Sequence, residues 1–192
     1  MNTIIKKLLT KRTHLLGEKI LPFIQEGESV LDFGCSDMAI LKYIASKKKI
    51  SFTGIDIFDY NVQDANFIKY DGGKLPFKDE QFDVVLSLFV LHHTDNSPFY
   101  LKELIRVSKR KIILCEDTYQ NKIEEILAKL MHCIYNYNLI KNINKRPINF
   151  KSIKEWNELF EKNKVNIKTF KRISSFPFSF IPTRMVIIEL WK

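Results

Sequence analysis

The chain has 192 residues, 45% of them hydrophobic and 28% charged, and this composition excludes a disordered or fibrous protein. Its length suits one compact domain, so we expect a single domain over residues 1–192. The 31 Lys and Arg outnumber the 22 Asp and Glu, which gives a formal net charge of +9 and allows attraction to nucleic acid or anionic lipid. Most of the cations are lysines scattered through the chain, so nucleic acid is the less favoured partner.

The sequence contains no run of 18 or more apolar residues, and lysines interrupt the apolar residues near its start. We therefore expect neither a secretory signal nor a membrane span. The three cysteines, Cys35, Cys115 and Cys133, are widely spaced and odd in number, which fits neither a disulfide framework nor a paired-cysteine zinc site. The prediction is a cytoplasmic protein with reduced thiols.

Residues 4–21 carry apolar side chains at helical spacing between lysines, which predicts an amphipathic leading helix within an N-terminal cap of residues 1–27. Such a helix usually packs on its own domain, and the alternative is that it lies on a membrane. Beyond it, short apolar segments alternate with segments of helical periodicity, which predicts an α/β fold with a mostly parallel sheet. The predicted strands are residues 29–33, 50–57, 66–70, 82–90, 111–116, 165–173 and 185–191, and the predicted helices are residues 38–46, 98–107, 121–140 and 152–161.

Two residues at the ends of the first two predicted strands have the spacing of a nucleoside site. Gly34 follows the first strand, where a residue without a Cβ lets the backbone approach a ligand closely. Asp56 lies at the end of the second strand, at about the separation where an acidic residue accepts hydrogen bonds from a ribose. The alternative is that this aspartate only caps a helix or forms a turn.

At these residues the sequence resembles a known family, the class I S-adenosylmethionine-dependent methyltransferases, and within it the branch that acts mostly on small molecules. The resemblance covers residues 28–117 closely. Its motifs are residues 30–35 (VLDFGC), 54–56 (GID), 71–77 (DGGKLPF), 82–85 (FDVV), 91–93 (LHH) and 103–107 (ELIRV), while Asn149, Phe150, Trp156 and Phe160 are similar to a C-terminal segment. It implies a Rossmann-like sheet of seven strands, mostly parallel with an antiparallel last strand and helices on both faces, and S-adenosyl-L-methionine as cofactor.

The resemblance also implies roles for individual residues. Asp32 and Gly34, with Cys35 and Ser36 in the same motif, would border the methionine moiety. Asp56 would bind the ribose, and Ile57 would pack on the adenine. The remaining cofactor contacts would come from Asp71 and Gly72 beside the adenine, and from carbonyl oxygens of Ser87 or Leu88 toward the ligand's ammonium group.

One feature departs from the family pattern. Ser36 and Met38 stand where the first motif usually has glycine, at a tight turn between strand and helix. Either the helix stands off slightly, or the Met38 side chain points away, or cofactor binding is weakened.

His92 and His93 follow the fourth predicted strand and are the candidate catalytic residues, since an imidazole titrates near neutral pH and can accept a proton. The alternative is that one histidine caps the next helix and the other is packed. Asp95, Glu116 and Asp117 are further polar candidates at strand ends. Two carboxylates without a third ligand are weak evidence for a cation, so we predict no metal.

The predicted helix over residues 121–140 repeats apolar residues every three and four positions. Such a face usually belongs to the core, and the alternative is that it lines a lipophilic pocket. The resemblance implies that residues 121–150 form a helical insertion covering the substrate side.

The leading hypothesis is methyl transfer from S-adenosylmethionine to O, N or C of a small molecule. The first alternative is an inactive methyltransferase-like binding or scaffold protein, which the residues Ser36 and Met38 motivate. The second is an RNA methyltransferase, which the charge of +9 motivates. The sequence indicates neither the methyl acceptor nor the oligomeric state.

Overall fold

The computed structural model describes residues 3–139, 148–173 and 184–192. The chain forms two compact units. One consists of Met1–Leu88 with Leu104–Ile113, and the other of Phe89–Glu103 with Leu114–Lys192.

The first unit contains four parallel strands, β1 (Ser29–Phe33), β2 (Ser51–Asp56), β3 (Phe67–Lys69) and β4 (Phe82–Leu88). Strand β1 lies between β2 and β4, so that Phe33 is paired with Ile55 on one side and with Ser87 on the other. Val30 and Leu31 are fully buried, as expected for a central strand of a parallel sheet. This register places the carboxyl ends of β1, β2 and β4 at one edge, where open parallel sheets bind ligands.

The first unit also contains α1 (Thr3–Ile20), the short helix η1 (Leu21–Phe23) and α2 (Ala39–Ala45). A Cβ added at Gly17 in α1 would lie 2.2 Å from the ring of Tyr43 in α2, so the missing side chain lets the two helices meet. The ring of His14 lies 4.8 Å from that of Tyr43, centroid to centroid. The leading helix therefore packs on its own unit along its second half.

Helix α3 (Ser97–Val107) and strand β5 (Ser108–Tyr119) run through both units. The second unit adds η2 (Leu91–His93), α4 (Lys122–Leu139), β6 (Lys151–Ser152), α5 (Ile153–Lys162), β7 (Asn166–Ile173) and β8 (Arg184–Trp191). A capping box starts α5, in which Ser152 Oγ accepts from the amide of Glu155 at 3.2 Å and Glu155 Oε2 accepts from the amide of Ser152 at 2.7 Å. Strands β7 and β8 pair antiparallel.

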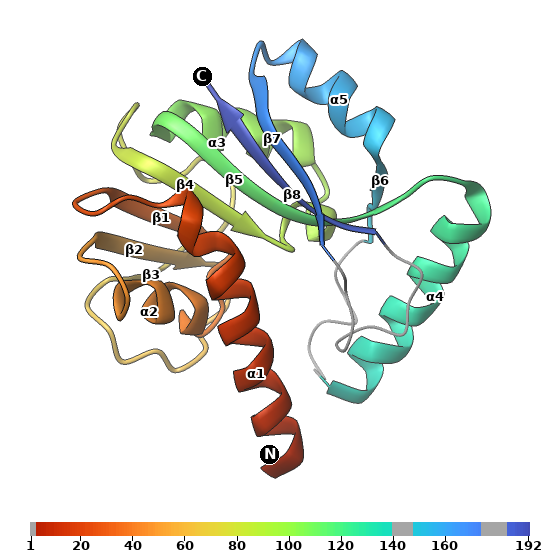
Figure 1. Cartoon of the computed structure of the whole chain (residues 1–192), viewed down its shortest axis with the longest axis horizontal. Coiled ribbons are helices and arrows are strands. Elements are labelled where there is room, and N and C mark those ends of the chain that lie inside the picture. Colours follow the sequence, from red (N-terminus) through yellow and green to blue (C-terminus); the bar gives the residue numbers. More distant parts are fainter. Residues whose placement is uncertain (1–2, 140–147, 174–183) are drawn as a thin grey trace. The chain divides into compact units, whose positions relative to one another are not determined.

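The hydrogen-bonded strand order is β3-β2-β1-β4-β5-β8-β7, and Figure 1 shows these strands along the chain. The expected α/β class with a mostly parallel, Rossmann-like sheet and antiparallel C-terminal pairing is confirmed. Over the described residues, the path of seven strands is the predicted sheet, and the two-residue β6 is an addition that pairs with β5 at Thr118 and Tyr119. A segment of two residues carries no periodicity that a sequence pattern could reveal.

Every predicted strand and helix is found, with small shifts at the ends. Strand β4 ends at Leu88, two residues earlier than expected, because Phe89 has a φ of 61° and cannot continue a strand. Strand β5 extends three residues beyond the prediction at each end. Residue 140, the last of a predicted helix, lies outside the described residues.

The apolar face of α4 is turned to solvent. Ile123, Ile126 and Leu130 are 71%, 58% and 54% exposed, and Leu127 between them is 39% exposed. The sequence predicted that this face belongs to the core, and over the described side chains that prediction is wrong.

No helix within the described ranges is long and apolar enough to cross a membrane. Cys35 and Cys115 are buried free thiols, and the side chain of Cys133 lies outside the described residues.

Candidate functional site

The loop after β1 has a backbone conformation that favours glycine, although Gly34 is its one glycine. Gly34, Ser36 and Met38 have φ values of 74°, 52° and 61°, all in the left-handed region. A non-glycine residue pays about 1–2 kcal/mol in this region, so the surrounding structure must hold Ser36 and Met38 there. Ser36 and Met38 therefore both adopt a backbone conformation that normally favours glycine.

Met38 fits because the facing strand supplies the space. Its side chain is fully buried, and its Cε would lie 3.0 Å from a Cβ added at Gly54 of β2. The same added Cβ would lie 2.7 Å from Cys35 Sγ. Of the three consequences expected for Met38, the structure shows the side chain directed into the core, against a glycine.

Asp56 joins the loop to the end of β2. One carboxylate oxygen accepts from the amide of Ser36 at 2.9 Å, and the other accepts from the amide of Phe58 at 3.0 Å. The side chain is only 5% exposed, while the neighbouring Ile57 is 44% exposed. A buried acceptor next to an exposed apolar side chain suits a ligand with a ribose and an aromatic ring.

Asp32, beside Asp56, is buried within β1. Burial, with a smaller contribution from the charge of Asp56, raises the pKa of Asp32 to about 8. Burial and the same two carboxylates also raise the pKa of the Cys35 thiol, which stays neutral. A pair of buried acids that resists a second negative charge is suited to a cationic ligand.

The other predicted cofactor residues lie at the ends of β3 and β4 in the same unit. Asp71 is exposed in the turn that follows β3, and Gly72 there has a φ of 93°. Ser87 and Leu88 end β4. The hydroxyl of Ser87 is buried and has no hydrogen-bond partner among the described residues, which leaves one polar atom available to a ligand.

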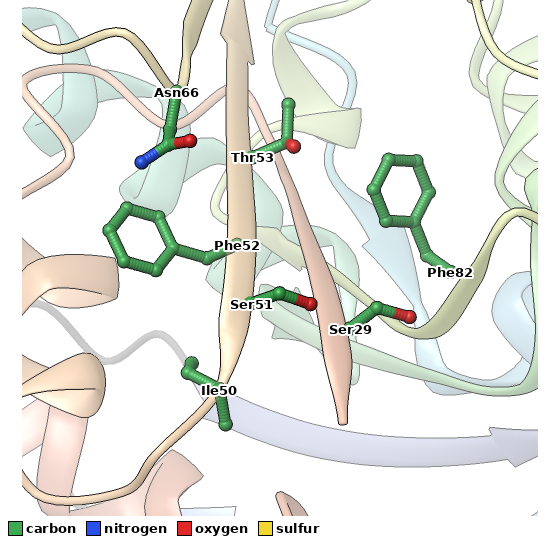
Figure 2. Close-up of a pocket in the computed structure, with 7 residues that line it drawn as sticks. All are labelled: Ser29, Ile50, Ser51, Phe52, Thr53, Asn66 and Phe82. Carbon is green, nitrogen blue, oxygen red and sulfur yellow. The ribbon is translucent and has the colours of Figure 1, made fainter. Parts of the chain in front are cut away.

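A separate hollow opens at the other end of the strands (Figure 2). Ser29, Ser51 and Phe82, which begin β1, β2 and β4, line it together with Ile50, Phe52, Thr53 and Asn66. Figure 2 shows Phe52 and Asn66 on one side of β2 and Ser51 and Thr53 on the other. No charged side chain lines this hollow, and Ser29 Oγ already donates to Asp83 at 2.6 Å. It is not the predicted cofactor site.

The candidate histidines lie in the second unit, in η2, and Glu116 of β5 anchors that turn. Glu116 Oε1 accepts from the amides of Val90 at 3.2 Å and Leu91 at 2.9 Å. Its Oε2 lies 2.5 Å from His92 Nδ1. Because Glu116 and His92 are almost completely buried, this carboxylate fixes the imidazole's orientation.

The rest of the histidine surroundings are aromatic. The ring of His92 lies 4.2 Å from that of His93 and 4.9 Å from that of Phe150. The backbone amide of Asn149 donates to the carbonyl of His92 at 2.8 Å, so the segment before α5 contacts the histidine turn. His93 is half-buried, while Asp95 is exposed.

The sequence analysis missed the anchoring role of Glu116, which it considered as a cation ligand. A signal was available. An acid that ends an apolar run such as KIILCE is buried with that run, and a buried carboxylate needs donors nearby.

A parallel sheet, a left-handed loop after its first strand and an acid after its second are typical of nucleoside-binding α/β domains. A family model described as "Methyltransferase domain" matches residues 31–115 of the chain. The demethylmenaquinone methyltransferase of Tropheryma whipplei (strain Twist) is 28% identical over 153 residues, which cover 72% of this chain and 64% of the relative. The cycloartenol-C-24-methyltransferase of Arabidopsis thaliana is 27% identical over 118 residues, which cover 55% of this chain and 34% of the relative.

Among solved structures, magnesium protoporphyrin IX methyltransferase from Synechocystis PCC 6803 with bound SAH superposes with a TM-score of 0.67 at 17% identity. The match covers 100% of this chain and 88% of that chain, and it shows a shared fold. These comparisons support the predicted resemblance to the class I S-adenosylmethionine-dependent methyltransferases, whose cofactor is S-adenosylmethionine. The chain spans about two thirds or less of the length of these curated relatives.

Proposed function

We propose that the protein transfers a methyl group from S-adenosylmethionine to a small, largely apolar acceptor. The observation that carries this proposal is the pairing of the left-handed loop at Ser36 with the Asp56 carboxylate and the exposed Ile57. In this proposal Asp56 accepts from the ribose hydroxyls, Ile57 covers the adenine, and Asp71 and Gly72 lie beside it. Asp32 with Gly34, Cys35 and Ser36 borders the methionine part, and Ser87 and Leu88 meet its ammonium group.

Bound S-adenosylmethionine supplies a methyl group already attached to a good leaving group. The chain's own residues then have to hold both partners and take a proton from the acceptor. We assign that proton to His92 or His93. Glu116 Oε2 lies 2.5 Å from His92 Nδ1 and fixes the orientation of that imidazole.

The relatives support an apolar acceptor. Two of them are named for demethylmenaquinone and cycloartenol, which are a quinone and a sterol and therefore mainly hydrocarbon. An RNA acceptor is less favoured, since many basic side chains are engaged in ion pairs. Examples are Lys42 with Asp64, Lys109 with Asp83, and Arg110 and Lys111 with Glu28. The scaffold alternative is less favoured, because the bulky Met38 side chain is accommodated against Gly54.

Calorimetric titration with S-adenosylmethionine and S-adenosylhomocysteine tests the cofactor site. We expect micromolar binding that falls at least about tenfold in Asp56→Asn, which loses the charge that accepts from the ribose. Asp59→Asn is the matched control, since Asp59 is an exposed aspartate that accepts from its own loop at 2.8 Å. Absence of binding to the wild type, or an equal loss in both variants, would overturn the proposal.

Binding should also depend on pH. A cation beside Asp32 favours its charged form, so cofactor binding should release a proton and tighten between about pH 6 and about pH 8. Asp32→Asn should remove that dependence. Incubation with methyl-labelled cofactor and either a total lipid extract or total RNA then tests the acceptor. Label in the organic phase supports the proposal, and label confined to RNA contradicts it.

A further inference from the structure

Arg106, in the last turn of α3, contacts the loop between β3 and β4 at several points. Its guanidinium donates from Nη1 to the carbonyl of Phe77 at 2.8 Å and from Nη2 to the carbonyl of Leu75 at 3.0 Å. Nη1 also pairs with Asp79 at 2.8 Å, and the backbone carbonyl of Arg106 accepts from the amide of Glu80 at 2.8 Å. Both the side chain and the backbone of one residue therefore fix this loop.

The bonds from the guanidinium to the two carbonyls are the important ones. Asp79 is 76% exposed, so its ion pair with Arg106 is screened by water and contributes little. The Arg106 side chain is only 18% exposed, and a planar guanidinium donates in fixed directions. It therefore sets the distance between two acceptors, which the single ammonium group of a lysine cannot do in the same way.

Asp71 and Gly72, which the proposed function places beside the adenine, belong to the same loop. The loop is tethered ahead of them by the amide of Tyr70, which donates to the carbonyl of Asp56 at 3.1 Å. It is tethered after them at Leu75, by the guanidinium. The two proposed adenine contacts thus lie in a short turn between two fixed points.

The turn between these tethers contains two adjacent glycines. Gly72 and Gly73 have φ values of 93° and 78°, and a Cβ added at Gly73 would have nothing within 4 Å. Asp71, which precedes them, is exposed. Because glycine restricts the backbone less than any other residue, the tethers at the ends of the turn decide where the Asp71 carboxylate lies.

We propose that Arg106 is a positioning residue for the adenine end of the cofactor site, because it fixes Leu75 and thereby the place of the Asp71 carboxylate. This inference rests on the proposed function. The alternative is that Arg106 only stabilises the fold, together with the buried Leu75 and the ring of Phe77, which lies 4.9 Å from that of Phe82. A stabilising role would weaken all ligands alike, whereas a positioning role changes the selectivity for the base.

The test is calorimetric titration of the full chain with S-adenosylhomocysteine and with S-inosylhomocysteine, in which a carbonyl oxygen replaces the amino group of the adenine. A carboxylate accepts from the amino group and repels the carbonyl, so the wild type should bind S-adenosylhomocysteine at least about tenfold more tightly. Arg106→Met should lower this ratio to less than about threefold, because the Asp71 carboxylate is no longer held against the base. Arg106→Lys, which keeps the charge but loses the planar fork, should give an intermediate ratio.

Lys109→Met is the matched control, since Lys109 is a cation of the same unit that pairs with Asp83 of β4 at 3.1 Å. Its ratio should stay within about twofold of the wild-type ratio. Asp71→Ala should remove the preference by itself. Arg106→Met added to Asp71→Ala should then change the ratio by less than about twofold, because both changes act on the same contact.

The outcomes separate this inference from the proposed function. A wild-type ratio in Arg106→Met, or an equal fall in Lys109→Met, overturns the positioning role and leaves the proposed function in place. A wild type that binds both ligands equally does the same, since Asp71 then makes no contact with the amino group. A wild type that binds neither ligand overturns the proposed function and this inference with it. Should Arg106→Met fail to fold, Arg106→Lys decides, and a wild-type ratio in that variant overturns the positioning role.

Discussion

The loop after β1 and the turn after β4 hold bulky residues in the same unfavourable backbone conformation by different means. Met38 in the loop and Phe89 in the turn both have a φ of 61°. Met38 is held by packing, because its side chain fills the space that Gly54 leaves open. Phe89 donates its amide to Cys115 at 2.7 Å and precedes two amides that donate to Glu116. One region is fixed by shape and the other by hydrogen bonds to a buried charge.

The two regions also differ in the surroundings that they give a buried carboxyl group. Glu116 faces two amide donors and an imidazole. Burial, with a smaller contribution from the charge of the nearby Asp56, raises the pKa of Asp32 to about 8. A satisfied carboxylate stabilises its surroundings, while an uncompensated one is retained at a cost, which is typical of a binding site. The comparison therefore marks the turn after β4 as structural support and agrees with the ligand-binding role proposed for the loop after β1.

Removing the buried charge of Glu116 from the turn after β4 should have the largest effect on stability. Glu116→Leu leaves the amides of Val90 and Leu91 and the imidazole of His92 without their buried acceptor. The free energy of unfolding should fall by about 3–5 kcal/mol, measured by urea denaturation.

Glu116→Gln is the control for that change, since it keeps the size and one acceptor oxygen. Its loss should be about half as large or less. A leucine variant as stable as the wild type would show that the turn is not held by this carboxylate.

The packing of the loop after β1 is tested by Gly54→Ala. The new Cβ would lie 2.7 Å from Cys35 Sγ and 3.0 Å from Met38 Cε, so we expect a loss of about 1–3 kcal/mol by urea denaturation. Cys35→Ala in the same chain should restore part of that loss, because it removes the closest atom.

Gly27→Ala separates crowding from backbone conformation. Gly27 has a φ of 80° but nothing lies within 4 Å of an added Cβ, so its loss of about 1 kcal/mol would reflect conformation alone. An effect of Gly54→Ala that Cys35→Ala leaves unchanged would contradict the packing explanation.

The uncompensated acid predicts a pH dependence of stability. Folding raises the pKa of Asp32 from 3.8 to about 8, so the folded state binds the proton more tightly than the unfolded state. The contribution of this group is fully present below about pH 4 and is lost as the pH rises toward 8. Asp32→Asn keeps the shape without titrating, so it should be similar to the wild type near pH 4 and more stable by about 1 kcal/mol or more near pH 9.

Thermal denaturation across that pH range measures the difference. A constant offset between Asp32→Asn and the wild type at every pH would contradict the assigned pKa. Weaker cofactor binding by the more stable variant would connect the cost of Asp32 to function.

Much of the fold was predictable because local signals agree with the tertiary structure. The capping serine of α5 and its apolar face of Trp156, Leu159 and Phe160 are all visible in the sequence, and all three apolar residues are buried. Strands β1 and β4 are apolar on both faces, as buried parallel strands require. The two-residue β6 was not predictable, since its pairing depends only on where β5 lies.

The candidate site was predictable only in part. The spacing of Gly34 and Asp56 indicated a nucleoside, and the resemblance supplied roles that stay predictions. The fit of Met38 could not be read from its own position, because the compensating residue, Gly54, lies 16 residues later on another strand. The exposed face of α4 could not be read either, since periodicity gives the orientation of side chains and not what covers them.

The smallest expected effect comes from restoring a glycine. Ser36 has a φ of 52°, and its amide donates to Asp56 at 2.9 Å, so the backbone already does what a glycine would allow there. Ser36→Gly removes the steric strain of the left-handed conformation in the folded state, and it also raises the conformational entropy of the unfolded chain. The two effects nearly cancel, so the free energy of unfolding should change by less than about 1 kcal/mol. Cofactor affinity, measured by calorimetric titration, should change by less than about threefold, because the donor to Asp56 is unchanged. A larger loss of affinity would mean that the Ser36 hydroxyl itself contacts the ligand. The loop would then be a variant with its own chemistry and not a glycine loop preserved by packing.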